Sequence, residues 1–159
     1  MTVDIGVEAI NRSSLEGFGK TIINRGATAS EAGNVTSIDI YVRLDKDITG
    51  LIVGIFYATN GNTLKCRSAQ AIAGTITGGS KVSKVVSLSV EIGDYIGCYF
   101  TGGELERDRS GYAGYWTKTG EYIDVDDEAT YSLLSGDAIS LGGYLAVAAA
   151  GRSFGFIIG

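Results

Sequence analysis

The sequence has no histidine and no proline, and it has only two cysteines, one methionine and one tryptophan. Without histidine, neither a Ser-His-Asp triad nor a Cys-His pair can form, and the usual imidazole-rich metal sites are excluded as well. Glycosidase chemistry remains open, because it requires only two carboxylates. The composition therefore excludes most hydrolase mechanisms, and we expect a protein that is not an enzyme.

The lack of proline goes together with 24 glycines in 159 residues. This combination is typical of many tight turns between short strands, and it excludes collagen, which needs a strict glycine period together with proline. Hydrophobic residues make up 45% of the chain, which excludes a disordered polypeptide. At this length we expect one domain with a substantial core.

Basic residues are also few, since 13 Lys and Arg face 18 Asp and Glu and give a formal net charge of −5. A chain with this charge repels a phosphate backbone, so we expect no nucleic-acid partner. The first 14 residues lack the basic cap and apolar core of a secretory signal, so we expect no conventional export. In a reducing cytosol, Cys66 and Cys98 are expected to be buried free thiols, with a disulfide as the alternative.

Residues 82–100 contain the clearest strand pattern in the sequence. The apolar face of the first half comprises Val82, Val86, Leu88, Val90 and Ile92. This period of two is typical of a half-buried strand and not of a helix. After a Gly-Asp turn, a second strand has apolar or aromatic groups on both faces, which favours a central position. We expect the two strands to pair, with Leu88 and Ile96 in the core.

Other segments have equally local signals. Residues 35–44 alternate as a strand with one wet face, whereas residues 51–58 are apolar on both faces and predict a central strand, in which Gly54 marks a bulge or a close neighbour. The Asn-Gly pair within residues 59–62 favours a type I′ hairpin. About nine or ten short strands without an amphipathic helix predict an all-β fold, a two-sheet antiparallel β-sandwich of jelly-roll type.

Two acidic segments could carry chemistry. In the first, Glu104, Glu106 and Asp108 alternate and could share one strand face, with Arg107 and Arg109 on the other. Adjacent alternate positions lie too close together to bracket a sugar in the usual way. We therefore predict a solvated charged hairpin, with a catalytic carboxylate pair as the alternative.

The second acidic segment supplies several hard oxygens within five residues, as calcium prefers. It consists of Asp124, Asp126, Asp127 and Glu128. The segment lacks the glycine and the terminal glutamate spacing of an EF-hand loop. It is interpreted as a solvent-facing acidic turn, with a structural calcium site as the alternative. No other cofactor is expected.

Aromatic residues are concentrated between positions 95 and 122, where the sole tryptophan and five of the nine tyrosines lie. Aromatic faces flanked by carboxylates are a common means of stacking on sugar rings. Tyr112, Tyr115 and Trp116 are therefore candidates for a glycan platform. The alternative is that these side chains fill the core or a subunit interface.

Residues 142–159 are almost wholly apolar, but Gly151 and Arg152 interrupt them. The uninterrupted part is too short to span a bilayer, so we expect no membrane partner. We accordingly divide the chain into a sandwich domain, residues 1–141, and an apolar C-terminal segment, residues 142–159. This segment is either the last strand of its own sandwich or an addition to a neighbouring subunit's sheet. In the second case Phe154, Phe156 and Ile158 form the inter-subunit contact.

Four stretches together carry a resemblance: VDIGVEAINR, VTSIDIYV, GDYIGCYF with the following GGELERDRSGYAGYW, and GDAISL. They resemble small phage- and prophage-encoded β-sandwich proteins of virions, over about residues 3–141. The resemblance implies a structural role as a capsid decoration, tail or fibre component, located in the virion after assembly in the host cytoplasm. The partners it implies are further copies of the chain, other virion proteins and surface glycans. A carbohydrate-binding β-sandwich module is the alternative function.

Overall fold

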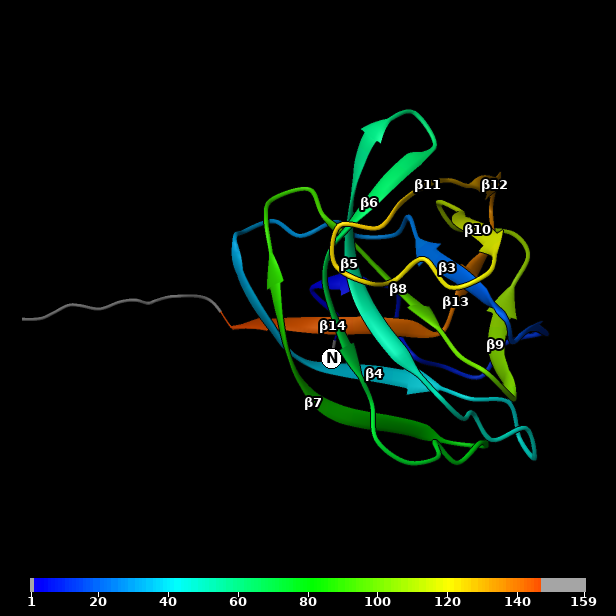
Figure 1. The fold of residues 1–159 in the computed structure, drawn as a ribbon. Coiled ribbons are helices and arrows are strands. Elements are labelled where there is room, and N and C mark those ends of the chain that lie inside the picture. The colour runs from blue at the N-terminus through cyan, green and yellow to red at the C-terminus, as the bar shows by residue number, and fades with distance from the viewer. Residues whose placement is uncertain (1, 147–159) are drawn as a thin grey trace, which may run out of the picture.

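The computed structural model describes residues 2–146, and Figure 1 shows their arrangement. All elements of regular secondary structure in this part of the chain are β-strands, and all pairings between these strands are antiparallel. The described residues contain no helix long and apolar enough to cross a membrane. The prediction of an all-β, sandwich-like antiparallel fold is confirmed.

A four-stranded sheet forms one layer of the molecule. Its strands, in order across the sheet, are β1 (Ile5–Gly6), β14 (Leu141–Ala146), β4 (Gly33–Tyr41) and β7 (Lys81–Val90). The alternation predicted for residues 35–44 corresponds to β4, where Ile38 and Ile40 are fully buried. Both ends of the described part of the chain therefore contribute to this sheet, because β1 pairs with β14.

A seven-stranded sheet forms the opposite layer. Its strands, in order, are β11 (Glu128–Thr130), β6 (Thr63–Ala71), β5 (Ile52–Asn60), β8 (Tyr95–Tyr99), β3 (Lys20–Asn24), β10 (Tyr115–Thr119) and β12 (Ser132–Leu134). Strands β5 and β8 lie side by side in its interior. Their predicted central positions are confirmed. Both strands are apolar on both faces because the main core covers one face of this sheet and a smaller apolar cluster covers the other.

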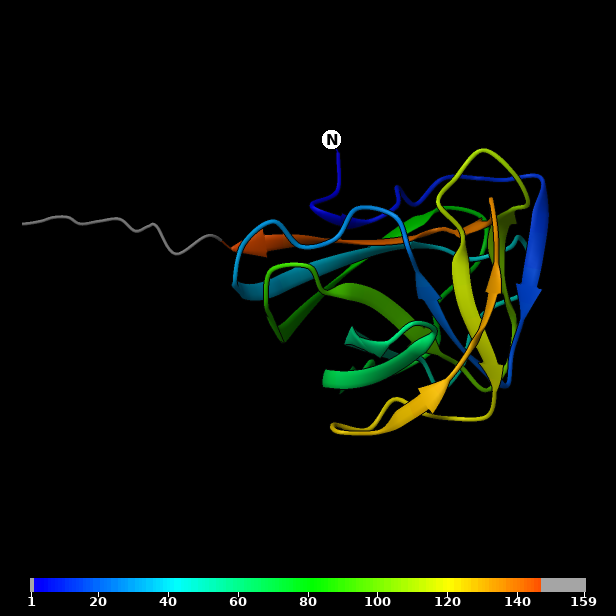
Figure 2. The ribbon, with the colours of Figure 1, turned by 90° about the horizontal axis from the view of Figure 1, so that it is seen from above.

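A third, three-stranded sheet continues the first layer. It consists of β13 (Ala138–Ile139), β9 (Glu104–Asp108) and β2 (Ser14–Gly17). Only Ser140 separates β13 from β14, and its amide donates a hydrogen bond to the Glu106 carbonyl at 3.0 Å. In Figure 2, β14 (orange) and β4 (light blue) lie over the β5–β6 hairpin (teal), with β2 and β9 closing one side.

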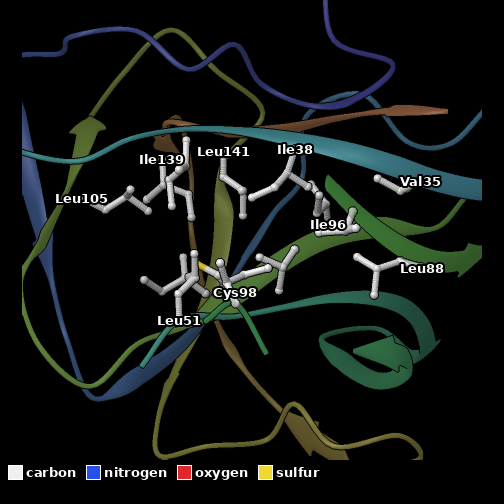
Figure 3. Packing of buried hydrophobic residues seen from close by; sticks show 14 of the residues in the cluster. Val35, Ile38, Leu51, Leu88, Ile96, Cys98, Leu105, Ile139 and Leu141 are labelled. Atoms are coloured by element: carbon white, nitrogen blue, oxygen red, sulfur yellow. The ribbon is translucent and has the colours of Figure 1, made fainter. Parts of the chain in front are cut away.

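The main core fills the space between these layers, and Figure 3 shows its packing. Leu88 of β7 and Ile96 of β8 approach each other there from opposite sheets, and both are fully buried, which confirms their predicted placement. Cys98 lies in the same core as a free thiol, and burial raises its pKa to about 12. Its predicted unpaired, buried state is confirmed.

A smaller apolar cluster covers the outer face of the seven-stranded sheet. Its buried members are Ile23, Phe56, Leu64, Cys66, Trp116, Ile123 and Tyr131. Gly54 makes room for it, because a Cβ there would lie 2.8 Å from Ile123, which confirms the predicted close neighbour. Cys66 is a buried free thiol, as predicted, and burial, together with the charges of Asp127 and Asp124, raises its pKa to about 12.

The pairing predicted within residues 82–100 is wrong, although both strands exist. β7 lies at the edge of the four-stranded sheet and β8 lies inside the seven-stranded sheet, so the connection crosses between layers. Backbone hydrogen bonds with Ala29, in the loop before β4, hold the turn between β7 and β8. The Gly93 amide donates to the Ala29 carbonyl, and the Ala29 amide donates to the Asp94 carbonyl. Ile92, predicted to face the core, is 72% exposed in this turn.

The β5–β6 hairpin forms one residue later than predicted. Asn60 pairs with Thr63, so the two loop residues are Gly61 and Asn62, and of these Gly61 alone has a positive φ, 61°. That pattern is typical of a type II′ turn with glycine first, and not of the predicted type I′ turn. The shift frees the Asn62 side chain, whose Oδ1 accepts a hydrogen bond from Trp116 Nε1 at 2.9 Å.

Residues 142–146, the first part of the predicted C-terminal segment, form part of the sandwich. They continue β14, which lies between β1 and β4. Gly142 and Gly143 are required there, because a Cβ on Gly142 would lie 2.5 Å from the Val7 carbonyl oxygen and a Cβ on Gly143 would lie 2.9 Å from the Val35 side chain of β4. The predicted contact residues Phe154, Phe156 and Ile158 lie outside the described residues.

Candidate functional site

The charged strand β9 is buried in an ion-pair network, so the prediction of a solvated hairpin is wrong. Glu106 is 1% exposed and accepts hydrogen bonds from the Arg12 amide at 2.7 Å and from Arg43 Nη1 at 3.3 Å. Arg12 Nη1 in turn donates to Asp108 Oδ2 at 2.8 Å. The predicted alternation is correct, because Glu106 and Asp108 do share the face that meets Arg12.

On the opposite face of β9, Arg107 lies in a second group of buried charges. Its Nε donates to Asp137 Oδ2 at 2.9 Å, and its Nη1 donates to Glu16 Oε2 at 3.3 Å. The Tyr115 hydroxyl donates to the same Glu16 oxygen. These contacts compensate the cost of burying charge, which is large for an unpaired group.

The pKa shifts in this group keep its charges in place. Burial alone would raise the pKa of Glu16, but hydrogen bonds from Tyr115 and Lys20 and the charges of Lys20 and Arg107 outweigh burial and lower the pKa. Burial and the bond to Glu16 raise the pKa of Tyr115. Glu16 is therefore an anion at neutral pH and is held by fixed donors. A general acid or base would need a pKa near the working pH, so this arrangement favours a structural role.

The acidic loop brings together only part of the predicted calcium set. Carboxylate oxygens of Asp124 and Asp127 lie within 4.8 Å of one another and of Glu121, which the sequence prediction missed. Glu128 instead accepts a hydrogen bond from the Thr59 hydroxyl at 2.6 Å, and Asp126 adopts a positive φ of 74° at the turn. Three carboxylates offer a partial coordination shell, because calcium takes six to eight oxygens.

The predicted glycan platform of Tyr112, Tyr115 and Trp116 does not form. Tyr115 is fully buried in the main core and Trp116 is 3% exposed in the outer cluster, where its ring meets Tyr95 edge-on with centroids 4.9 Å apart. The two residues are neighbours on β10 and so point to opposite faces of a sheet that is covered on both sides. Their prediction as a sugar-binding surface is wrong, and Tyr112 alone is substantially exposed, at 38%.

Exposed Tyr112 borders a pocket of about 240 Å³ that opens beside β1. Its lining is largely apolar, and the contributing residues are Thr2, Val3, Gly6, Val7, Glu8, Ile10, Arg12, Ala27 and Tyr112. Reciprocal backbone hydrogen bonds between Gly6 and Ala27, at 2.8 and 3.2 Å, hold one wall against β1. Glu8 is exposed at the rim and supplies negative charge there.

Arg12 holds the opposite wall of this pocket. Its Nη2 donates to the Glu8 carbonyl at 2.7 Å, its Nη1 to the Tyr112 hydroxyl at 2.8 Å, and its Nε to the Ser140 hydroxyl at 2.7 Å. Arg12 itself is 7% exposed, so the loop after β1 and the Tyr112 ring are tied to a buried anchor. The pocket is therefore preformed, as binding sites usually are.

Sequence reasoning missed Arg12 and the pocket because the partners are distant along the chain. Arg12 and Glu106 are 94 residues apart, and Arg12 and Tyr112 are 100 apart. No local period or motif links such positions.

The comparisons with known proteins give no match. No family model, no curated protein and no solved structure matches this chain.

Proposed function

We propose that the chain is a non-enzymatic structural protein of a phage virion, a capsid decoration, tail or fibre component that associates with copies of itself. The observation that carries the proposal is the position of β14. This strand lies inside the four-stranded sheet and leads directly into residues 147–159, whose only charged residue is Arg152. A fixed interior strand is thus followed in the sequence by an apolar segment.

The end of β14 is held by contacts from two neighbours. The Tyr144 hydroxyl donates to Asp39 Oδ2 at 2.8 Å, and the Leu145 amide donates to Asp4 Oδ2 at 2.8 Å. Apolar segments outside a membrane require cover by protein. Burial of Phe154, Phe156 and Ile158 against a neighbour would contribute about 1.5–3 kcal/mol each, which is sufficient to organise assembly.

The charged side chains of the body support a structural role. Glu16, Glu106 and Asp137 are buried and accept hydrogen bonds from arginine side chains. The segments that resemble small virion sandwich proteins also contribute strands β1, β4, β8, β9, β10 and β13, the frame of this body. With Tyr115 and Trp116 buried, no observation favours a carbohydrate-binding module over this proposal.

Light scattering on the full chain tests self-association. The wild type is expected to form a defined oligomer, and Phe154→Ser/Phe156→Ser is expected to be a folded monomer. The virion location is tested by mass spectrometry of purified particles from cells that carry the gene, in which the chain is expected at fixed stoichiometry. A monomeric wild type at high concentration, together with its absence from particles, would overturn the proposal.

A further inference from the structure

We infer that the pocket beside β1 is the acceptor site for residues 147–159 of a second copy of this chain, with Phe154 or Phe156 as the inserted side chain. The inference rests on the proposed self-association and names the surface that receives the segment. The pocket is preformed, because Arg12 ties the loop after β1 to Tyr112 and the Gly6–Ala27 bonds fix the other wall.

The pocket and the segment match in apolar character. Val3, Val7 and Ile10 supply aliphatic lining beside the Tyr112 ring, and Ile10 is 43% exposed. An aromatic side chain inserted there gains apolar burial together with a ring contact to Tyr112. Phe154 and Phe156 are two residues apart, so in an extended segment they lie on one face and either can face the pocket.

Charge complementarity points to the same match. Arg152 is the only charged residue in 147–159, and without it the formal net charge falls from −5 to −6. Exposed Glu8 lies at the rim and carries a negative charge there. The pocket's own cation, Arg12, is buried and paired with Asp108. The Arg152 side chain is therefore attracted to the acidic rim.

The direction of β14 favours a second copy over the same molecule. Gly6 pairs with Gly142, and the Val7 amide donates to the Leu141 carbonyl, so the pocket lies beside the first residues of β14. β14 then runs away from the pocket to Ala146, about 15 Å further on at 3.3 Å per residue, and Figure 1 shows its arrow leading outward. Reciprocal exchange between two copies forms a closed, isologous dimer.

Ile10→Lys tests the pocket, and Ile92→Lys is its control, because Ile92 is an exposed isoleucine, at 72% against 43% for Ile10, that does not line the pocket. Ile10→Lys is expected to raise the dissociation constant at least about tenfold in sedimentation velocity, since it removes an apolar contact and repels Arg152. Ile92→Lys is expected to assemble like the wild type. Thermal unfolding followed by circular dichroism verifies that both variants fold.

A mixing experiment identifies the occupant. Ile10→Lys retains its apolar segment and Phe154→Ser/Phe156→Ser retains its pocket, so an equimolar mixture is expected to form heterodimers that neither variant forms alone. The exchange Glu8→Arg with Arg152→Glu is likewise expected to restore the association that each single substitution weakens.

The outcomes separate the two proposals. If the phenylalanine variant is monomeric while Ile10→Lys assembles like the wild type, self-association stands and the pocket is not its acceptor. If Ile10→Lys is monomeric while the phenylalanine variant assembles, or if the mixture yields no heterodimer, the segment is not the occupant. A monomeric wild type removes both proposals.

Discussion

The Tyr115 hydroxyl donates a hydrogen bond to the Glu16 carboxylate across 99 residues of sequence. This bond joins β10 of the seven-stranded sheet to β2 of the three-stranded sheet. The same carboxylate accepts from Lys20 and Arg107, so one buried anion connects the two layers at the closed side of the sandwich. The stability of the fold should depend on this junction.

Tyr115→Phe is expected to lower the free energy of unfolding by about 1–3 kcal/mol, because it removes a donor to a buried carboxylate. Tyr131→Phe is the matched control, since the buried Tyr131 hydroxyl has no hydrogen-bond partner among the described residues. Its loss is expected to be neutral or stabilising. Urea unfolding measures both variants, and an equal cost at the two positions would contradict the role assigned to Glu16.

Stability is expected to fall at acid pH. The pKa of Glu16 lies below the ordinary value of 4.5 in the folded protein, so this group stabilises the fold above that value and the stabilisation is lost as pH falls through the lowered pKa. Asp108, whose pKa the Arg12 and Ser13 hydrogen bonds lower despite its burial, acts in the same direction.

Urea midpoints between about pH 6 and pH 3 measure this dependence. Glu16→Gln is expected to flatten the acid limb, because the variant has no carboxyl group to protonate at this position. Glu31→Gln, at an exposed position, is expected to retain the wild-type slope. An unchanged slope in Glu16→Gln would show that Glu16 is not the group responsible.

Leu88→Ala and Ile96→Ala are each expected to cost about 2–5 kcal/mol, because both side chains are fully buried between opposite layers. Val85→Ala on the same strand as Leu88 is the control, since Val85 is 85% exposed. It is expected to change stability by less than about 0.5 kcal/mol. Chemical unfolding of the three variants gives the comparison, and a cost below about 1 kcal/mol at Leu88 or Ile96 would refute the assigned packing.

Gly6→Ala and Gly93→Ala separate backbone strain from steric overlap. Both glycines have positive φ, 84° and 89°, so alanine at either position is strained by about 1–2 kcal/mol. At Gly6 the added Cβ would also lie 2.6 Å from the Leu141 carbonyl oxygen and 2.7 Å from Ile96, whereas at Gly93 nothing lies within 4 Å. Gly6→Ala is therefore expected to be the more destabilising in thermal unfolding, and similar losses would show that the β1–β14 contact can relax.

Local alternation determined much of the fold from sequence. Residues 51–58 and the strand that contains Ile96 are apolar on both faces, and each occupies the interior of a sheet covered on both sides. Leu88 and Ile96 lie in the core because their parity along a strand fixes the face on which they lie. The two cysteines are buried for the same reason, since each lies on the apolar side of its strand.

Only the tertiary structure decided which strands pair and which charges are buried. The Gly-Asp turn after β7 is compatible with a hairpin, but its backbone bonds with Ala29 direct β8 into the other layer. Glu106 and Arg107 are buried because folding brings their charged partners to them. Arg12 is 94 residues from Glu106 in the sequence, and Glu16 is 91 residues from Arg107. Trp116 is buried because residues distant from β10 cover the outer face of its sheet. Strand periodicity is a property of the local backbone. The pairing of strands, the partners of buried charges and the burial of a sheet face depend instead on contacts between residues that are distant in the sequence.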